Sequence, residues 1–251
     1  MIKGKVIAIV VGLVGAVLLT PVITRNWANI MQSGVAPEER VRQARERATP
    51  LLEAKFKSKK LSYPPAEIYL RAFKDDKVLE LWASKTAGKP MTLVHAYPVA
   101  GQSGKLGPKR REGDRQVPEG FYEIDRFNPA SKFWLSLGIN YPNASDRILS
   151  DKEKPGGDIF IHGDNRSIGC LAMTDPIIEE IYLAALDARA RGQKRIRVDI
   201  FPSRNPATLS TKTPEMKKLW FSLQAGLNQF ESTKRPPRFK VSTDGSYVVL
   251  D

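Results

Sequence analysis

The sequence predicts a mainly β domain with flanking helices, and three observations support this prediction. Apolar and polar residues alternate in several short segments, most clearly at 68–72 and 79–83, as in strands of a sheet. Two longer segments, 175–192 and 213–230, place apolar residues at the spacing of an amphipathic helix. The length of 251 residues and the 41% hydrophobic content suit one substantial domain with attachments.

The N-terminus carries a run that is long enough to cross a bilayer. Lys3 and Lys5 precede an uncharged, mostly aliphatic stretch from Val6 to Thr24. A cleaved signal peptide has a shorter apolar core and a small-residue cleavage site, so residues 1–25 are predicted to be an uncleaved transmembrane signal anchor. A buried core helix is the weaker alternative, because the run has no polar face. The early lysines favour an inner-membrane anchor with the rest of the chain in the periplasm, or a secreted chain if the span is cleaved.

The elements after the span follow from periodicity and turn residues. Residues 26–60 are predicted to be a spacer and docking helix, which opens at Pro37 and is interrupted at Pro50. Segments 68–72 and 79–83 form a predicted hairpin about the Asp75–Asp76 turn. Further strands are predicted at 92–97, 121–127, 158–162 and 196–200, and we expect the last two to pair within a sheet.

The two amphipathic segments have readable ends. Asp175 is the predicted N-cap of the first helix, with Pro176 in its first turn and Gly192 after its end. The second helix starts at Thr213 and is expected to cover the sheet, and a small hairpin closes the chain at 247–250. The predicted organisation is therefore a main catalytic domain at 61–202 and a C-terminal helix and hairpin extension at 203–251.

Charge and residue counts exclude several kinds of site. The formal charge of +13 suits an anionic surface or polymer, but the predicted membrane span and the absence of zinc-finger or RNP-like patterns argue against nucleic acid as a partner. One cysteine allows no intrachain disulfide, and with only two histidines it makes no recognisable zinc cluster. No cofactor and no metal are expected.

The chemistry concentrates between Ile159 and Met173. His162 ends a short apolar strand, and Cys170, the single cysteine, follows eight positions later after a compact loop. Such a loop reverses the chain easily and brings an imidazole beside a thiol. A cysteine nucleophile needs a nearby base or positive field, because the free thiol is mostly protonated at neutral pH. A lone cysteine is more often an inert buried residue, but this context favours a nucleophile with His162 as its base.

The glycines complete a minimal acyl-transfer site. The carbonyl of Gly163 is the candidate that orients the imidazole through its other nitrogen. Gly169 permits a tight turn, so the amides of Gly169 and Cys170 are the candidate oxyanion donors. Ser167 is a weaker candidate for the nucleophile, and its expected role is to shape the loop beside the thiol.

These residues resemble the L,D-transpeptidase catalytic domain family of the YkuD type. His162-Gly163 and Ser167-Ile168-Gly169-Cys170 match its two half-motifs, and the upstream stretch 112–122 resembles its Gly-Asp-x-x-Thr-Pro-x-Gly segment with Val117 in place of Thr. The likeness covers roughly residues 63–202, and the short spacer resembles the YafK-like branch. The resemblance implies a β-sandwich or barrel catalytic domain. It also implies that Cys170 attacks a diaminopimelate-containing peptidoglycan stem peptide and forms a thioester.

The sequence departs from the family's pattern at one position that concerns substrate recognition. Ala172 stands where many members carry an arginine, a residue suited to a substrate carboxylate. Arg166 and Lys109 are the candidate substitutes. Three further candidates for substrate contact are Ser167, His95 and Tyr97.

Three functions stay open at this point. The first is a murein L,D-transpeptidase, which transfers the acyl group to an amine. The second is a hydrolase or amidase that releases a peptide, or a wall-linked protein, from diaminopimelate through the same thioester. The third is a non-catalytic protein that binds the cell wall.

Overall fold

The computed structural model describes residues 35–211 and 213–250. From Ala36 onward the chain forms one compact unit, so the spacer helix, the main domain and the C-terminal extension pack together. Within this part of the chain, no helix combines the length and apolar character that a bilayer crossing requires. The predicted membrane anchor at residues 1–25 lies outside the described residues.

The first described helix, α2, runs from Pro37 to Ser58 and continues through Pro50, so the predicted interruption at Pro50 is wrong. A proline inside a helix costs about 3 kcal/mol, because it removes one hydrogen bond and crowds the preceding turn. The turns after Pro50 bury Leu52 and Phe56 completely, and each such side chain contributes about 1.5–3 kcal/mol. Tertiary packing therefore outweighs the local preference.

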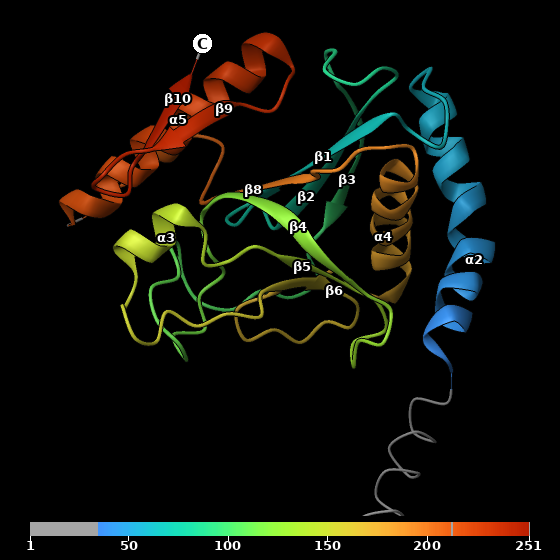
Figure 1. Cartoon of the computed structure of the whole chain (residues 1–251), viewed down its shortest axis with the longest axis horizontal. Coiled ribbons are helices and arrows are strands. Elements are labelled where there is room, and N and C mark those ends of the chain that lie inside the picture. The colour runs from blue at the N-terminus through green and yellow to red at the C-terminus, as the bar shows by residue number, and fades with distance from the viewer. Residues whose placement is uncertain (1–34, 212, 251) are drawn as a thin grey trace, which may run out of the picture. The chain divides into compact units, whose positions relative to one another are not determined.

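Helix α2 docks on helix α4 (Asp175–Ala190), and α4 lies between α2 and the sheet (Figure 1). Charged pairs link the two helices: Arg45 with Asp187, Arg47 with Glu179, and Lys55 with Glu180. The carboxylates of these pairs are nearly buried on α4, whereas Arg45 and Arg47 of α2 stay about half exposed. The pairs favour one register of α2 on α4.

Eight strands form one mixed sheet in the order β3-β2-β1-β8-β4-β5-β6-β7. They are β1 (Glu67–Phe73), β2 (Val78–Ser84), β3 (Thr92–Pro98), β4 (Gly120–Asn128), β5 (Ser136–Ile139), β6 (Phe160–His162), β7 (Leu171–Ala172) and β8 (Arg197–Phe201). The predicted hairpin is confirmed as the antiparallel pair β1–β2. An isolated bridge between Gly101, just after β3, and Ala172 of β7 joins the two ends of the strand order, which gives the sheet a barrel-like curl.

The predicted pairing of the strands near 158–162 and 196–200 is wrong. β8 lies between β1 and β4, and β6 lies between β5 and β7. Alternation predicts which residues of a strand share a face, but it carries no information about which strand is the neighbour. The sequence analysis also missed β5, β7, the short helix α3 (Ala144–Leu149) and the 3-10 turn η1 (Pro206–Thr208).

The start of α4 differs by one residue from the prediction. Thr174 is the N-cap, with a positive φ of 71°, and Asp175 is the first helical residue. The Asp175 carboxylate instead accepts a hydrogen bond from the backbone N–H of Asp164 at 2.9 Å. A residue expected to cap the helix therefore holds the loop that follows His162.

The C-terminal segment covers one face of the sheet, as expected. It consists of helix α5 (Pro214–Thr233) and the antiparallel strands β9 (Arg238–Val241) and β10 (Tyr247–Leu250). Leu70 of β1 packs in the core that includes α2 and α4, whereas Tyr69 and Phe73 pack against aromatic and aliphatic residues of α5. Neighbouring residues of a strand point to opposite faces, so the helices α4 and α5 cover opposite faces of the sheet.

Candidate active site

His162 ends strand β6 and is almost completely buried, with 3% of its surface exposed. Its Nδ1 lies 2.5 Å from the carbonyl oxygen of Gly163. A carbonyl only accepts hydrogen bonds, so this contact places the proton on Nδ1 and leaves Nε2 as the basic nitrogen. The ring of Phe133 stacks on the imidazole at 4.6 Å between centroids and 29° between planes. The imidazole is thus fixed on one edge and on one face.

Gly163 is glycine because three groups approach its Cα closely. A Cβ at this position would lie 2.4 Å from Asp175 Oδ1, 2.6 Å from the Phe133 carbonyl oxygen and 3.2 Å from Trp134 Cβ. Its backbone N–H donates to the carbonyls of Phe133 and Leu135, at 3.0 and 3.2 Å. Packing on both sides therefore fixes the carbonyl that contacts His162.

Cys170 directly precedes β7, which runs parallel to β6 with Ala172 opposite His162. Strands about 4.8 Å apart with a rise of about 3.3 Å per residue put the Cα atoms of Cys170 and His162 roughly 8 Å apart, within the combined reach of the two side chains. The sulfur accepts a hydrogen bond from the N–H of Phe160 at 3.4 Å and lies 3.8 Å from the carbonyl oxygen of Asp158. Between the described residues Cys170 and His162 themselves, the structure has no hydrogen bond.

Burial sets the protonation of both groups. It raises the pKa of the Cys170 thiol, against a smaller lowering by the N–H of Phe160. It lowers the pKa of His162, against smaller raising effects of the Gly163 carbonyl and of Asp164. At neutral pH the structure therefore holds a neutral thiol and a neutral imidazole. The sequence-based expectation that His162 raises the thiolate fraction does not describe this arrangement.

Ser167 organises the loop that carries the cysteine. Its hydroxyl donates to the carbonyl of Cys170 at 2.7 Å and accepts from the amides of Gly169 and Cys170, at 3.3 and 3.0 Å. Gly169 has a φ of +127°, which an L residue rarely adopts. The two amides predicted to be oxyanion donors thus point at Ser167 in this structure. Ile168, between Ser167 and Gly169, is 80% exposed.

Cys170 opens into a cleft of about 820 Å³. Two loops line it, the segment from Lys109 to Arg115 and the segment from Glu153 to Ile159, and Ile168 borders it beside the cysteine. Lys109 is 4% exposed, and its Nζ donates to Asp114 Oδ1 at 2.7 Å and to the Arg111 carbonyl at 2.8 Å. Lys109 therefore belongs to the wall of the cleft, and its ammonium group has one N–H beyond these two hydrogen bonds.

The other predicted substrate residues lie elsewhere. The Arg166 side chain is 80% exposed, pairs with Asp164 and does not line the cleft, so the structure brings Lys109 and not Arg166 to Cys170. His95 and Tyr97 lie on β3, where the Tyr97 hydroxyl donates to Glu180 of α4 at 2.8 Å and the two rings pack edge to face. Their place beneath the helices argues against the predicted substrate contact.

The sequence analysis missed Phe133 altogether, and it placed Asp114 in the upstream motif without assigning it a role. Phe133 comes from a loop 29 residues before His162, and no local pattern connects the two positions. Asp114 accepts hydrogen bonds from Lys109 and from the amides of Arg110, Arg111 and Gln116, and thereby folds the loop that carries Lys109. A Gly-Asp pair in a loop rich in basic residues was a usable signal for such a turn. Among the described residues, no cluster of three or more His, Cys, Asp or Glu side chains has the arrangement of a metal site.

Comparisons with known proteins identify the family of this chain. The model of the L,D-transpeptidase catalytic domain, YkuD, matches residues 69–200. The chain is 37% identical over 186 residues to YafK of Escherichia coli (strain K12), a protein named for a presumed L,D-transpeptidase activity, and the match covers 72% of this chain and 73% of that protein. The same values hold for YafK of Escherichia coli O157:H7.

Two solved structures are also similar. The helical cell shape determining protein Pgp2 from Campylobacter jejuni, in its K307A form, aligns with a TM-score of 0.44 and 24% identity, over 66% of this chain and 55% of that one. Bd1075 from Bdellovibrio bacteriovorus aligns with a TM-score of 0.39 and 17% identity, over 66% of this chain and 57% of that one. This chain thus spans just over half the length of each structure. The family model covers more than half of the chain, and the chain therefore belongs to the L,D-transpeptidase catalytic domain family of the YkuD type.

Proposed function

We propose that this protein is a murein L,D-transpeptidase that transfers acyl groups at diaminopimelate in peptidoglycan stem peptides through a thioester on Cys170. One observation carries the proposal. His162, with Nδ1 against the Gly163 carbonyl and Nε2 left basic, ends strand β6. The neighbouring strand β7 directly follows Cys170, which borders a cleft of about 820 Å³. The family match supports a role on peptidoglycan.

The reaction begins with a neutral thiol on Cys170 and a neutral imidazole on His162. As the sulfur attacks the substrate carbonyl, the thiol proton passes to Nε2 of His162, and a rotation about the Cα–Cβ bond of Cys170 takes the sulfur from the Phe160 amide toward the imidazole. The tetrahedral intermediate collapses to a thioester, and the leaving amine takes the proton from the imidazolium. An incoming amine or water then attacks the thioester, gives a proton to Nε2, and releases Cys170 with its proton restored.

Oxyanion stabilisation in this proposal comes from the amides of Gly169 and Cys170. Both now donate to the Ser167 hydroxyl, which also donates to the Cys170 carbonyl. The developing charge on the substrate oxygen is a stronger acceptor than a hydroxyl, so the amides exchange one partner for the other as the intermediate forms.

Substrate recognition falls to Lys109 in this proposal. Ala172 is fully buried, its backbone pairs with Gly101, and an arginine side chain does not fit there without displacing the β7 edge. Lys109 lines the cleft and has one N–H to donate, which suits the free carboxylate of a stem peptide. The exposed Ile168 at the cleft mouth supplies apolar contact to the same peptide.

The proposed location is the periplasmic side of the inner membrane, with residues 1–25 as the anchor. This proposal rests on the uncharged run from Val6 to Thr24 behind two lysines. It is consistent with a single unpaired thiol, because a lone cysteine forms no intrachain disulfide in an oxidising compartment.

Product analysis tests the function. The full-length protein in detergent is incubated with disaccharide tetrapeptides and, separately, with peptidoglycan that carries covalently linked protein, and products are identified by mass spectrometry. Cross-linked dimers support transpeptidation, whereas shortened monomers or freed protein support the hydrolase. Intact-protein mass under acidic quench should show the acyl group on Cys170, and Cys170→Ala should lose the adduct and every product. Full product formation by Cys170→Ala would refute the thioester on Cys170, whereas absence of every product from the wild-type protein would leave a wall-binding role.

A further inference from the structure

One wall of the cleft contains the Lys109 loop, which we define as residues 107–117. Lys109 lines the cleft from this loop, and Asp114 folds the loop around it. The Tyr141 hydroxyl lies 3.4 Å from the Lys109 carbonyl oxygen and 3.0 Å from that of Pro155, so the Lys109 loop contacts the second wall of the cleft. The position of Lys109 therefore depends on what holds the ends of its loop.

One buried ion pair holds both ends. Lys74 Nζ donates to the carbonyls of Gly107 and Val117, at 2.8 and 2.9 Å, and to Glu119 Oε1 at 2.8 Å. Glu119 Oε1 also accepts from the N–H of Gly107 at 2.7 Å. Lys74 is 2% exposed and Glu119 is 1% exposed, so the pair is shielded from water. All three ammonium protons are used, and the loop ends are held at one point.

The second oxygen of that carboxylate is satisfied by the C-terminal segment. Trp220, on α5, donates from its indole N–H to Glu119 Oε2 at 2.7 Å. The indole is 3% exposed, so water does not replace this donor when it is removed. Without the indole N–H, the buried Glu119 carboxylate lacks one hydrogen-bond donor, and neighbouring groups have to shift to supply another. The nearest such groups are Lys74 and the ends of the Lys109 loop.

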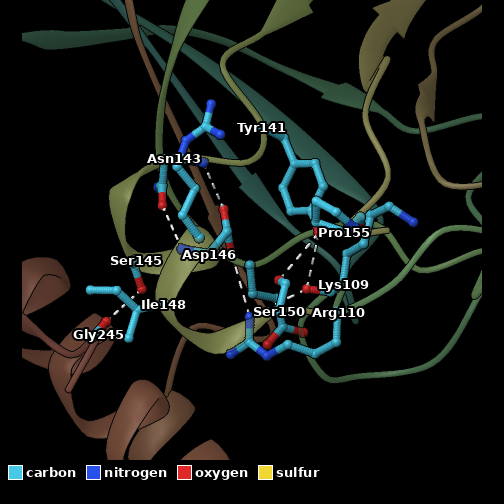
Figure 2. A network of polar contacts seen from close by, with 12 residues as sticks. Lys109, Arg110, Tyr141, Asn143, Ser145, Asp146, Ile148, Ser150, Pro155 and Gly245 are labelled. Carbon is cyan, nitrogen blue, oxygen red and sulfur yellow. Dashed lines mark hydrogen bonds and ion pairs between the residues drawn. The ribbon is translucent and has the colours of Figure 1, made fainter. Parts of the chain in front are cut away.

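A second connection runs in parallel through α3, as Figure 2 shows. Arg110 of the Lys109 loop contacts Asp146 of α3 at 3.4 Å and Glu215 of α5 at 3.2 Å. The Ser145 hydroxyl of α3 donates to the carbonyl of Gly245, in the turn between β9 and β10, at 2.5 Å. The C-terminal segment thus reaches the Lys109 loop by three routes: through Glu119 and Lys74, directly from Glu215 to Arg110, and through α3.

We propose that Trp220 is a positioning residue for substrate recognition: through Glu119 and Lys74 it holds the Lys109 loop in the place from which Lys109 meets the substrate carboxylate. This inference rests on the proposed function and extends it, because it assigns the C-terminal segment a role in substrate binding. The segment does not touch the sulfur or the imidazole, so the role concerns binding of the peptide and leaves the bond-making groups unchanged.

The test compares two tryptophan-to-phenylalanine variants of the full chain. Trp220→Phe removes the donor to Glu119. Trp82→Phe is the matched control, because the indole of Trp82 also donates to a buried carboxylate, that of Glu80, at 2.8 Å, on the β2 side of the molecule. For Trp220→Phe we expect KM for the stem peptide to rise about tenfold, with kcat within twofold of wild type. For Trp82→Phe we expect both constants within twofold of wild type at a similar loss of thermal stability.

A double-mutant cycle assigns the effect to Lys109. If Trp220 acts through Lys109, then Trp220→Phe adds less than twofold to the KM of Lys109→Gln. An equal tenfold rise in both backgrounds refutes the route. Unchanged KM in Trp220→Phe alone, with the same fall in melting temperature as Trp82→Phe, refutes the positioning role.

Hydrogen exchange keeps the inference testable without an activity. The amides of 107–117 should exchange about tenfold faster in Trp220→Phe than in Trp82→Phe, and equal rates refute the inference even if the proposed reaction fails. Conversely, loss of turnover in Cys170→Ala bears on the proposed function and not on Trp220. If Trp220→Phe does not fold, Glu119→Gln, which keeps an acceptor for Trp220 but removes the charge paired with Lys74, should speed exchange of the amides of 107–117 about tenfold relative to Trp82→Phe, and equal rates refute the inference.

Discussion

The Gly163→Ala substitution tests whether the backbone carbonyl beside His162 orients the imidazole. The new Cβ would stand 2.4 Å from Asp175 Oδ1 and 2.6 Å from the Phe133 carbonyl oxygen. An ordinary contact needs roughly 3.4 Å, so the backbone has to shift by roughly 0.8–1 Å. A shift of this size stretches the 2.5 Å contact between Nδ1 and the Gly163 carbonyl to about 3.5 Å, beyond hydrogen-bonding distance.

Loss of that contact frees the ring to adopt the other tautomer, in which Nε2 carries the proton and no longer serves as a base. Misplacement by about 1 Å costs on the order of 100-fold in rate, and a wrong tautomer in a related arrangement costs more. We therefore expect kcat/KM on stem peptides to fall at least about 100-fold. Crowding also lowers the free energy of unfolding by about 1–3 kcal/mol.

Leu52→Ala is the control for lost stability. Leu52 is fully buried on α2, and its truncation costs about 2–5 kcal/mol without touching the site. Activity per folded molecule should match wild type in this variant. The ¹⁵N shifts of His162 report the tautomer directly, and Gly163→Ala should lose the Nδ1-protonated pattern. A Gly163→Ala enzyme with kcat/KM within threefold of wild type, or with an unchanged tautomer, refutes the role assigned to the carbonyl.

Three further predictions follow from burial and helix geometry. Burial lowers the pKa of His162, so the acid limb of kcat/KM should lie below pH 6.5, and a limb above pH 6.5 contradicts this. Burial raises the pKa of the Cys170 thiol, so its alkylation should titrate above pH 9, and titration at an ordinary thiol value contradicts this. Burial raises the pKa of Asp146 from 3.8 to about 6. The free energy of unfolding should therefore be highest below pH 3.8 and fall by about 3 kcal/mol as pH rises through 6. Asp146→Asn should remove this pH dependence, measured by urea titrations at several pH values. Pro50→Ala should raise the free energy of unfolding by about 1–3 kcal/mol, and with it the melting temperature, because α2 is helical on both sides of the proline. An unchanged or lower melting temperature contradicts this account of the helix.

Local features were predictable because their causes are local. The hairpin about Asp75–Asp76, the helices at 175–190 and 214–233, and the closing hairpin all follow from periodicity and turn residues within each segment. Predictions from sequence pattern were wrong where contacts with distant parts of the chain determine the local structure or the pairing of a strand. Pro50 stays inside α2 because packing on α4 outweighs the local cost, and the strand near 196–200 pairs with β1 and β4 instead of β6.

The candidate site divides in the same way. His162, Gly163, Ser167, Gly169 and Cys170 lie within nine consecutive positions, so the sequence by itself determined the motif and, through it, the family. Only the tertiary structure decided that Lys109 and not Arg166 stands beside the cysteine, that Phe133 stacks on the imidazole, and that Trp220 reaches the loop of Lys109. The physical reason is that burial and contact between distant segments set the protonation of the thiol and the imidazole and the placement of charge around them. Neither property can be read from the order of residues in one segment.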